Sequence, residues 1–283
     1  MGHEFTGEVA AVGDGVEAWR VGDRAVSMPV FACGACRACA AGRPLDCRGA
    51  GFIGLGGAPG GYAEYVAVPG SLSFRVPDAV PDAVATLVEP LAVALHAVRL
   101  GLLCRDDAVL VVGAGPVGLA IALLCRHFGA AHVLVSDLVP ERAARAMALG
   151  ADGWIDAGRD DVRAAMRARC GRAPSLVFDA AGGAQGVQRC IDLAGAGGRI
   201  VVVAMHAAPS PVATMSAFLK ELTLVFAKAY TVLEFREALG LLASGAVDPA
   251  PMVTRTVGFA DFPAAFGALA TGGGGKLLLD PTA

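Results

Sequence analysis

The chain has 283 residues, of which 55% are hydrophobic and 17% charged, and its formal net charge is −3. A chain of this length exceeds one average domain, so we predict two. The 23 basic and 26 acidic side chains are spread along the sequence, which offers no basic patch for nucleic acid or anionic lipid and argues against both partners.

One apolar stretch has the length of a membrane span. Mean hydropathy is +0.59, and residues 108–125 form an 18-residue run without a charge. Glycines and a proline interrupt this run, and its first half is β-branched, which favours a buried parallel strand that turns into a helix. Met1 is followed by Gly-His-Glu, not by a basic and then apolar signal peptide. We therefore expect a cytoplasmic protein without a membrane partner.

Residues 1–90 are rich in glycine, valine and short turns, which predicts the short strands of an antiparallel barrel domain. Its first stretch, GHEFTGEVAAVGDGV, sets His3 beside Glu4 with glycines at positions 2, 7 and 13. Taken alone, a histidine beside a glutamate is ordinarily a surface pair. Only the longer pattern, with its spaced glycines, makes His3 and Glu4 candidates for a functional site.

A loop rich in Gly, Ala and Arg carries four cysteines with the spacing C-x2-C-x2-C-x7-C: Cys33, Cys36, Cys39 and Cys47. Four thiolates satisfy tetrahedral Zn²⁺ and leave no position open for a substrate, so we predict a structural zinc site that orders the loop. The alternatives are an iron–sulfur cluster or two disulfides, and the spacing and expected compartment favour zinc. The remaining cysteines are expected to be buried, inert thiols: Cys104, Cys125, Cys170 and Cys190.

From residue 91 the pattern changes to strands alternating with helices, in VLVVG, HVLVSD, GWIDA, SLVFDAAG and RIVVVA. This predicts an α/β fold for residues 91–227, a doubly wound, Rossmann-type parallel sheet. An amphipathic helix is expected around residues 235–242, and we assign residues 228–283 to a C-terminal segment that returns to the first domain. The glycine run 272–275 is predicted to be a mobile turn.

A G-x-G-x-x-G pattern follows the first strand of this domain and opens a helix. The predicted cofactor-binding turn consists of Gly113, Gly115, Pro116, Val117 and Gly118. Asp137 ends the next strand, where it would accept hydrogen bonds from the adenosine ribose and repel a 2′-phosphate, so NAD is favoured over NADP. Arg142 would either weaken that preference or lie against the adenine, and both remain open. The alternative is a glycine-rich turn without a nucleotide, which the complete strand–turn–helix context disfavours.

Together these motifs resemble the zinc-dependent medium-chain alcohol dehydrogenases over essentially the whole chain. The resemblance implies a GroES-like barrel for the first domain, His3 as a ligand of a catalytic zinc, and Glu4 as a neighbouring partner or exchangeable ligand. The segment EPLAVALHA resembles the polyol branch, the sorbitol and 2,3-butanediol dehydrogenases, which places Glu89 on the zinc; GFIGLGGAPGGYAEYV is similar to butanediol dehydrogenases in particular. Taken alone, Glu89 would be a helix N-terminal charge favoured by the macrodipole.

The resemblance implies an NAD-linked oxidation of a secondary alcohol, polyol or vicinal diol, with His3, Glu4 and Glu89 at the catalytic zinc. A zinc ion with an open position lowers the pKa of the bound hydroxyl, and the carbon then passes a hydride to NAD. Members of this family assemble as dimers or tetramers, so a homodimer or homotetramer is expected.

The family pattern places a further zinc-ligand cysteine before Gly-His-Glu, where this sequence has Met1. We therefore expect that an N-terminal segment is missing and that the catalytic zinc is weakened, because even outer partners of a metal ligand are worth roughly 10 to 100-fold in affinity. The competing hypothesis is a non-catalytic fragment that binds zinc and NAD without turnover. A third, a zinc-free quinone reductase relative, is opposed by the four cysteines and Glu89.

Overall fold

The structure is a computed structural model that describes residues 1–205, 208–269 and 275–283. The predicted turn at 272–275 lies outside the described residues except for Gly275. The chain folds into two compact units. The first consists of Met1–Ala92 and Ala229–Ala283, and the second of Val93–Lys228. The first unit is thus built from both ends of the chain, and the second from its middle.

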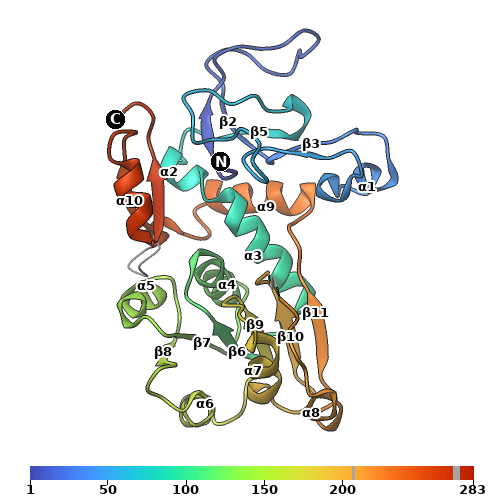
Figure 1. Cartoon of the computed structure of the whole chain (residues 1–283), viewed down its shortest axis with the longest axis vertical. Helices are drawn as coiled ribbons and strands as arrows, with labels where there is room; N and C mark the ends of the chain where they lie inside the picture. Colours follow the sequence, from blue (N-terminus) through green and yellow to red (C-terminus); the bar gives the residue numbers. More distant parts are fainter. Residues whose placement is uncertain (206–207, 270–274) are drawn as a thin grey trace. The chain divides into compact units, whose positions relative to one another are not determined.

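The second unit contains a six-stranded parallel sheet with the order β11-β10-β9-β6-β7-β8, visible in Figure 1. Its strands are β6 (Ala108–Val112), β7 (His132–Asp137), β8 (Gly153–Asp156), β9 (Leu176–Asp179), β10 (Arg199–Val202) and β11 (Thr223–Phe226). Its helices are α4 (Pro116–His127), α5 (Ala143–Ala148) after the 3-10 turn η3 (Pro140–Arg142), α6 (Val162–Cys170), α7 (Gly186–Leu193) and α8 (Thr214–Leu219). The predicted doubly wound sheet is confirmed, and its strand order reverses between β6 and β9, where such folds form their binding crevice.

The apolar run at residues 108–125 forms this core, as predicted. It becomes strand β6 and most of helix α4, and every residue of β6 is buried. A central parallel strand is covered by helices on both faces, which explains why its sequence is continuously apolar instead of alternating. Leu110 and Val112 of β6 share one core cluster with Leu134, Ile155 and Ile200 of other strands.

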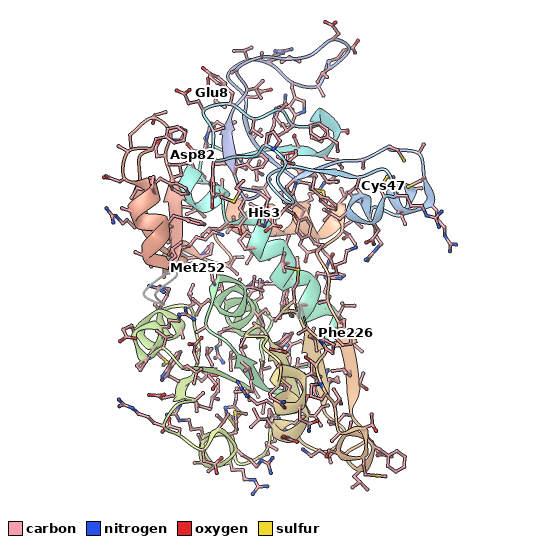
Figure 2. All side chains as sticks on the ribbon, in the orientation of Figure 1. His3, Glu8, Cys47, Asp82, Phe226 and Met252 are labelled. Atoms are coloured by element: carbon pink, nitrogen blue, oxygen red, sulfur yellow. The ribbon has the colours of Figure 1, made fainter. Side chains whose placement is uncertain are left out.

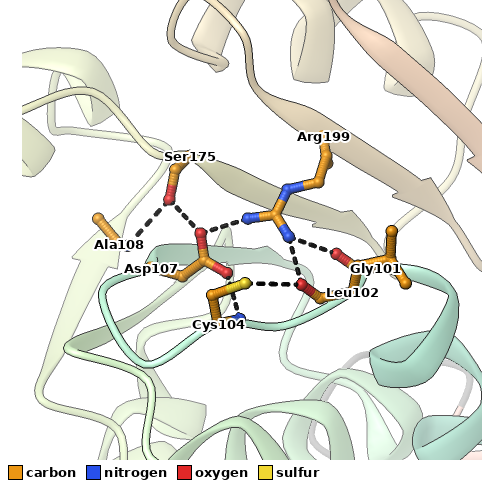
Figure 3. Close-up of polar contacts among 7 residues, drawn as sticks. All are labelled: Gly101, Leu102, Cys104, Asp107, Ala108, Ser175 and Arg199. Carbon is orange, nitrogen blue, oxygen red and sulfur yellow. Dashed lines mark hydrogen bonds and ion pairs between the residues drawn. The ribbon is translucent and has the colours of Figure 1, made fainter.

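Arg199 ties together the ends of the sheet strands that lie away from the glycine turn (Figure 3). Its guanidinium pairs with Asp107, just before β6, and donates to the carbonyl oxygens of Gly101 at 2.8 Å and Leu102 at 2.5 Å. Asp107 also accepts a hydrogen bond of 2.6 Å from Ser175, just before β9. These contacts join the amino ends of β6, β9 and β10. The carboxyl ends of the same strands lie at the opposite edge of the sheet, where open α/β sheets bind their ligands.

The first unit combines short antiparallel strands with the C-terminal segment. Strands β1 (Thr6–Glu8), β2 (Arg24–Ser27) and β5 (Ser73–Arg75) form one antiparallel sheet. The hairpin of β3 (Val30–Phe31) and β4 (Gly51–Phe52) encloses α1 (Arg37–Ala40) and η1 (Pro44–Asp46) of the cysteine loop. The unit also contains η2 (Gly70–Leu72), α2 (Asp82–Ala85), α9 (Val232–Ala243), η4 (Ala250–Met252), α10 (Phe262–Leu269), and the parallel pair β12 (Val253–Val257) and β13 (Lys276–Leu279).

Helix α3 (Val88–Leu100) begins in the first unit and ends in the second. It belongs to the stretch Asp82–Leu100, the only one in the described residues that is long and apolar enough to cross a membrane, with a mean hydropathy of 1.5. Inside the protein 67% of that stretch is buried, and Leu91 and Leu95 are almost fully enclosed. Such burial is typical of a core helix.

The prediction for the cysteines outside the loop is only half right. Cys125 and Cys190 are buried, and burial raises the pKa of both thiols. Cys104 is exposed because it lies in the turn before β6, where its thiol donates to the Leu102 carbonyl oxygen at 3.3 Å. Cys170 is partly exposed at the end of α6. The apolar residues around these two cysteines in the sequence therefore did not predict their burial.

Candidate metal centres and nucleotide pocket

The chain around His3 is held in place by a glycine-rich loop. The amide of Gly61 donates to the carbonyl oxygen of Gly2 at 2.7 Å. A Cβ atom on Gly54 or Gly60 would lie only 2.0 or 2.3 Å from that same oxygen, a separation that no side chain could accept. The loop segment between residues 54 and 61 therefore positions His3.

His3, Glu4 and Glu89 meet at one point, with one potential ligand atom from each lying within 4.8 Å of the others. Nε2 of His3 is 4.0 Å from Oε1 of Glu4. In a tetrahedral zinc site with metal–ligand distances of about 2.1 Å the ligand atoms lie about 3.4 Å apart, so two atoms at the 4.8 Å limit would need to approach by about 1.4 Å. Nitrogen and carboxylate oxygen are zinc ligands, and three of them leave a coordination position open. These residues thus fit a catalytic metal centre; Figure 2 labels His3 beside helix α3, which carries Glu89.

The charges at this point are strongly affected by burial. Glu89 lies in the first turn of α3, and burial raises its pKa to about 7, an effect that the hydrogen bond from Tyr230 partly opposes. Burial and then the charge of Lys276 lower the pKa of His3, which favours the neutral imidazole that a metal needs. Lys276 on β13 pairs with Oε2 of Glu4, and burial lowers the pKa of this lysine to about 8.

Tyr230 and Lys276 were not among the predicted site residues. The Tyr230 hydroxyl donates to Oε1 of Glu89 at 3.0 Å, across 141 positions of sequence. Lys276 follows the glycine run that was interpreted only as a turn. Both residues reach the site because the segment 229–283 belongs to the first unit, and neither has a motif that could have identified it.

The four cysteines of the loop also meet. Their sulfur atoms are separated by 3.5 Å for Cys36 and Cys39, 3.6 Å for Cys33 and Cys47, and 3.9 Å for Cys33 and Cys39. A tetrahedral zinc with Zn–S distances of about 2.3 Å spaces its sulfur atoms by about 3.8 Å, whereas a disulfide requires about 2.05 Å. The geometry therefore fits zinc and not disulfides.

Backbone amides contribute to this cysteine site. The amides of Ala35 and Cys36 hydrogen-bond to the sulfur of Cys33 and, with the neighbouring thiols, lower its pKa to about 6. A thiolate is the form that binds metal. With four sulfur ligands no position remains for a substrate, so this site suits a structural role.

The nucleotide motif lines a pocket of about 330 Å³ in the second unit. Gly113, Gly115, Asp137, Arg142 and Arg189 are among its lining residues. It lies beyond the carboxyl ends of β6 and β7, where open α/β sheets bind their ligands. Pocket and motif thus coincide.

The glycines of this turn are required by the backbone itself. Gly113 has φ +103, a conformation that L side chains rarely adopt. A Cβ on Gly118 would lie 1.9 Å from the carbonyl oxygen of Gly113, so only glycine lets α4 pack this closely. Gly115 has open space around its Cβ position, and Pro116 and Val117 begin α4 directly behind it. The N-terminus of α4 is therefore open to a phosphate.

Asp137 and Arg142 form an ion pair of 3.0 Å in this pocket. Asp137 also accepts hydrogen bonds from the amides of Ala114 at 2.6 Å and Val139 at 2.9 Å. The Nε of Arg142 is buried and has no hydrogen-bond partner among the described residues. The arginine thus stands directly beside the carboxylate predicted to select NAD.

The chain is similar to several known dehydrogenases. Residues 1–78 match the alcohol dehydrogenase GroES-like domain and residues 116–244 the zinc-binding dehydrogenase domain. An L-threonine 3-dehydrogenase of Anaeromyxobacter dehalogenans is 34% identical over 282 residues, 99% of this chain and 81% of that protein. The structure of 2R,3R-butanediol dehydrogenase from Bacillus subtilis has a TM-score of 0.88 at 34% identity, covering 99% of this chain and 80% of that one. The structure of the rspB alcohol dehydrogenase of Escherichia coli CFT073, complexed with NADH, matches this chain with a TM-score of 0.87 at 32% identity. The match covers 95% of this chain and 79% of that one.

Replacing Cys36 by Ser should remove one zinc per chain and lower the melting temperature, because the remaining three sulfurs hold the ion poorly and the loop has few buried residues of its own. Metal analysis and thermal unfolding measure both effects. Cys104→Ser is the matched control, since its thiol is exposed and distant in sequence from the loop. Equal zinc content in the two variants would contradict the structural site.

The stability of the metal-free protein should depend on the protonation of Glu89. Its pKa is raised from 4.5 to about 7 in the folded chain, so its contribution to stability is fully present below about pH 4.5 and is lost as the pH rises through 7. Glu89→Gln cannot ionise, and its unfolding free energy relative to the parent should rise by about 3 kcal/mol between these pH values. Denaturant unfolding of both proteins at several pH values measures this difference. His3, Glu4 and Lys276 are present in both proteins, so the difference between the two curves reports on Glu89. Parallel pH curves would refute it.

Proposed function

Because this chain belongs to the zinc-binding alcohol dehydrogenases, oxidoreductases that act on CH–OH groups, we propose that it oxidises secondary alcohols that carry a neighbouring polar group, vicinal diols above all. The observation that supports this most is the convergence of His3, Glu4 and Glu89. The names of two relatives point the same way, since both L-threonine and 2,3-butanediol have a secondary hydroxyl beside a carbon that carries nitrogen or oxygen.

In this reaction the substrate loses a proton from its hydroxyl and a hydride from its carbon, which leaves a ketone and NADH. When bound, zinc would make the hydroxyl more acidic and NAD⁺ would accept the hydride. His3 and Glu89 would hold the metal, His3 through a neutral imidazole nitrogen and Glu89 through a carboxylate oxygen. The protein's own task is therefore to fix these ligands and to orient the substrate.

Glu4 is suited to recognise the neighbouring polar group. One of its oxygens, Oε2, is paired with Lys276. The other, Oε1, is the oxygen that lies 4.0 Å from Nε2 of His3. The ion pair with Lys276 thus uses Oε2 and would leave Oε1 as an acceptor for a second hydroxyl of the substrate.

We further propose that the cofactor is NAD(H) and not NADP(H). Asp137 ends β7 in the pocket, where a carboxylate can accept the hydrogen bonds of the ribose and repel a 2′-phosphate. Arg142 offsets part of that charge, so the preference should be moderate.

The matched pair 2,3-butanediol and 2-butanol tests the substrate proposal, because both have the same carbon chain and a reactive secondary hydroxyl. With zinc and NAD⁺ supplied, kcat/KM for the diol should exceed that for 2-butanol by about tenfold or more. Glu4→Gln should reduce this ratio, because an amide is a weaker acceptor than a carboxylate. Equal rates for both substrates, or no oxidation of either, would contradict the proposal.

The cofactor preference should depend on Asp137. Changing Asp137 to Ser removes the repulsion and leaves Arg142 free to attract a 2′-phosphate, so the ratio of NAD⁺ to NADP⁺ affinity should fall by about tenfold or more. Fluorescence titration with NADH and NADPH measures this independently of turnover. Asp106→Ser, at the opposite end of β6, should leave the ratio unchanged. The assignment fails if the Asp137 variant behaves like this control.

We also propose that a second copy of the chain pairs with strand β11, an edge strand of the sheet. An edge strand offers unpaired backbone groups, and identical edges can pair around a two-fold axis. Large apolar side chains are exposed on β11 and the preceding α8: Met215, Phe218, Leu219, Leu224 and Phe226. A charge here should therefore disfavour association.

Phe226→Asp should convert a dimer or larger assembly into a smaller one, as measured by light scattering at several protein concentrations. Phe226 is labelled in Figure 2 and is 65% exposed. Phe128→Asp, an exposed phenylalanine after α4, is the control and should not change the mass. A monomeric parent protein, or an unchanged mass in the Phe226 variant, would exclude this interface.

A further inference from the structure

The carboxylate of Glu89 is held by the hydroxyl of Tyr230. The phenol oxygen lies 3.0 Å from Oε1 of Glu89, and both residues are buried, with exposed fractions of 3% and 8%. A carboxylate that binds a metal is ionised and can only accept hydrogen bonds, so the phenol must be the donor. The bond therefore uses one lone-pair site of Oε1 and fixes the orientation of the Glu89 carboxylate.

Tyr230 is itself rigidly placed. The preceding Ala229 has φ +56, the left-handed region that alanine rarely adopts. Directly after it, Thr231 begins α9 with a reciprocal capping pair to Glu234. The ring of Tyr230 packs on Phe235, with centroids 5.5 Å apart. The backbone on both sides and the ring contact thus fix the direction in which the hydroxyl points.

We propose that Tyr230 is a positioning residue for the metal centre, holding Oε1 of Glu89 so that Oε2 alone binds the ion. This inference rests on the proposed function, in which His3 and Glu89 hold the metal. A carboxylate bound through one oxygen leaves a coordination position for the substrate, whereas one bound through both oxygens would occupy it. Partners that orient a ligand in this way are worth roughly 10 to 100-fold in metal affinity.

Tyr230→Phe removes only the hydroxyl and keeps the ring that packs on Phe235. The experiment fills the cysteine site with one equivalent of Zn²⁺ and then titrates Co²⁺, whose visible absorption reports affinity and coordination number at the second site. The variant should bind Co²⁺ about tenfold more weakly than the parent and give weaker absorption, as expected for a higher coordination number. Zinc affinity at the cysteine site should not change.

Two further variants separate positioning from a general loss of stability. Tyr65→Phe removes the hydroxyl of a tyrosine that is 77% exposed and should match the parent in every measurement. Leu242→Ala opens the buried face of α9, so it should lower the melting temperature but leave the cobalt spectrum unchanged.

The inference is wrong if Tyr230→Phe binds Co²⁺ with the affinity and spectrum of the parent. It is also wrong if that variant loses affinity equally at both metal sites, or if Leu242→Ala reproduces its spectrum, since either result would indicate a purely structural role. A parent protein that takes up no second metal, or a Glu89→Gln variant that binds Co²⁺ as well as the parent, would overturn the proposed metal site itself together with this inference.

Discussion

The buried carboxylate of Glu89 is the constraint on which the first unit depends. An isolated charge inside a protein is costly unless it is paired or bound to a metal. Glu89 sits at the start of the core helix α3, with a hydrogen bond from Tyr230 and with His3 and Glu4 close by. A divalent cation at this point would compensate the negative charge of Glu89, whereas the charge of Glu4 is already paired with Lys276.

This arrangement explains why the chain returns to its first unit. His3 and Glu4 come from the beginning of the chain, Glu89 from the first turn of α3, and Tyr230 and Lys276 from the last segment. The glycine loop fixes His3 by close backbone packing, while the start of α9 fixes Tyr230. The cysteine loop has the opposite character, because its four ligands come from a span of 15 residues and leave no coordination position open.

The features that the sequence could predict are those encoded within short segments. The glycine fingerprint and the cysteine spacing each place all their residues within a single turn or loop, and the continuously apolar strands indicate a parallel sheet. Tyr230 and Lys276 were missed because their contacts with Glu89 and Glu4 depend on the tertiary fold and neither has a characteristic spacing. Cys104 was expected to be buried on the basis of its apolar neighbours, but a turn exposes it. In the same way, the position of Arg142 beside Asp137 could be established only from the folded pocket.

The most direct test of the central claim is a crystal structure of the zinc-loaded protein with anomalous diffraction measured on both sides of the zinc absorption edge. Our account predicts two anomalous peaks per chain, one among the four cysteine sulfurs and one within about 2.1 Å of Nε2 of His3 and of one oxygen of Glu89. A single peak at the cysteines, with Glu89 and His3 unchanged and no density between them, would contradict it.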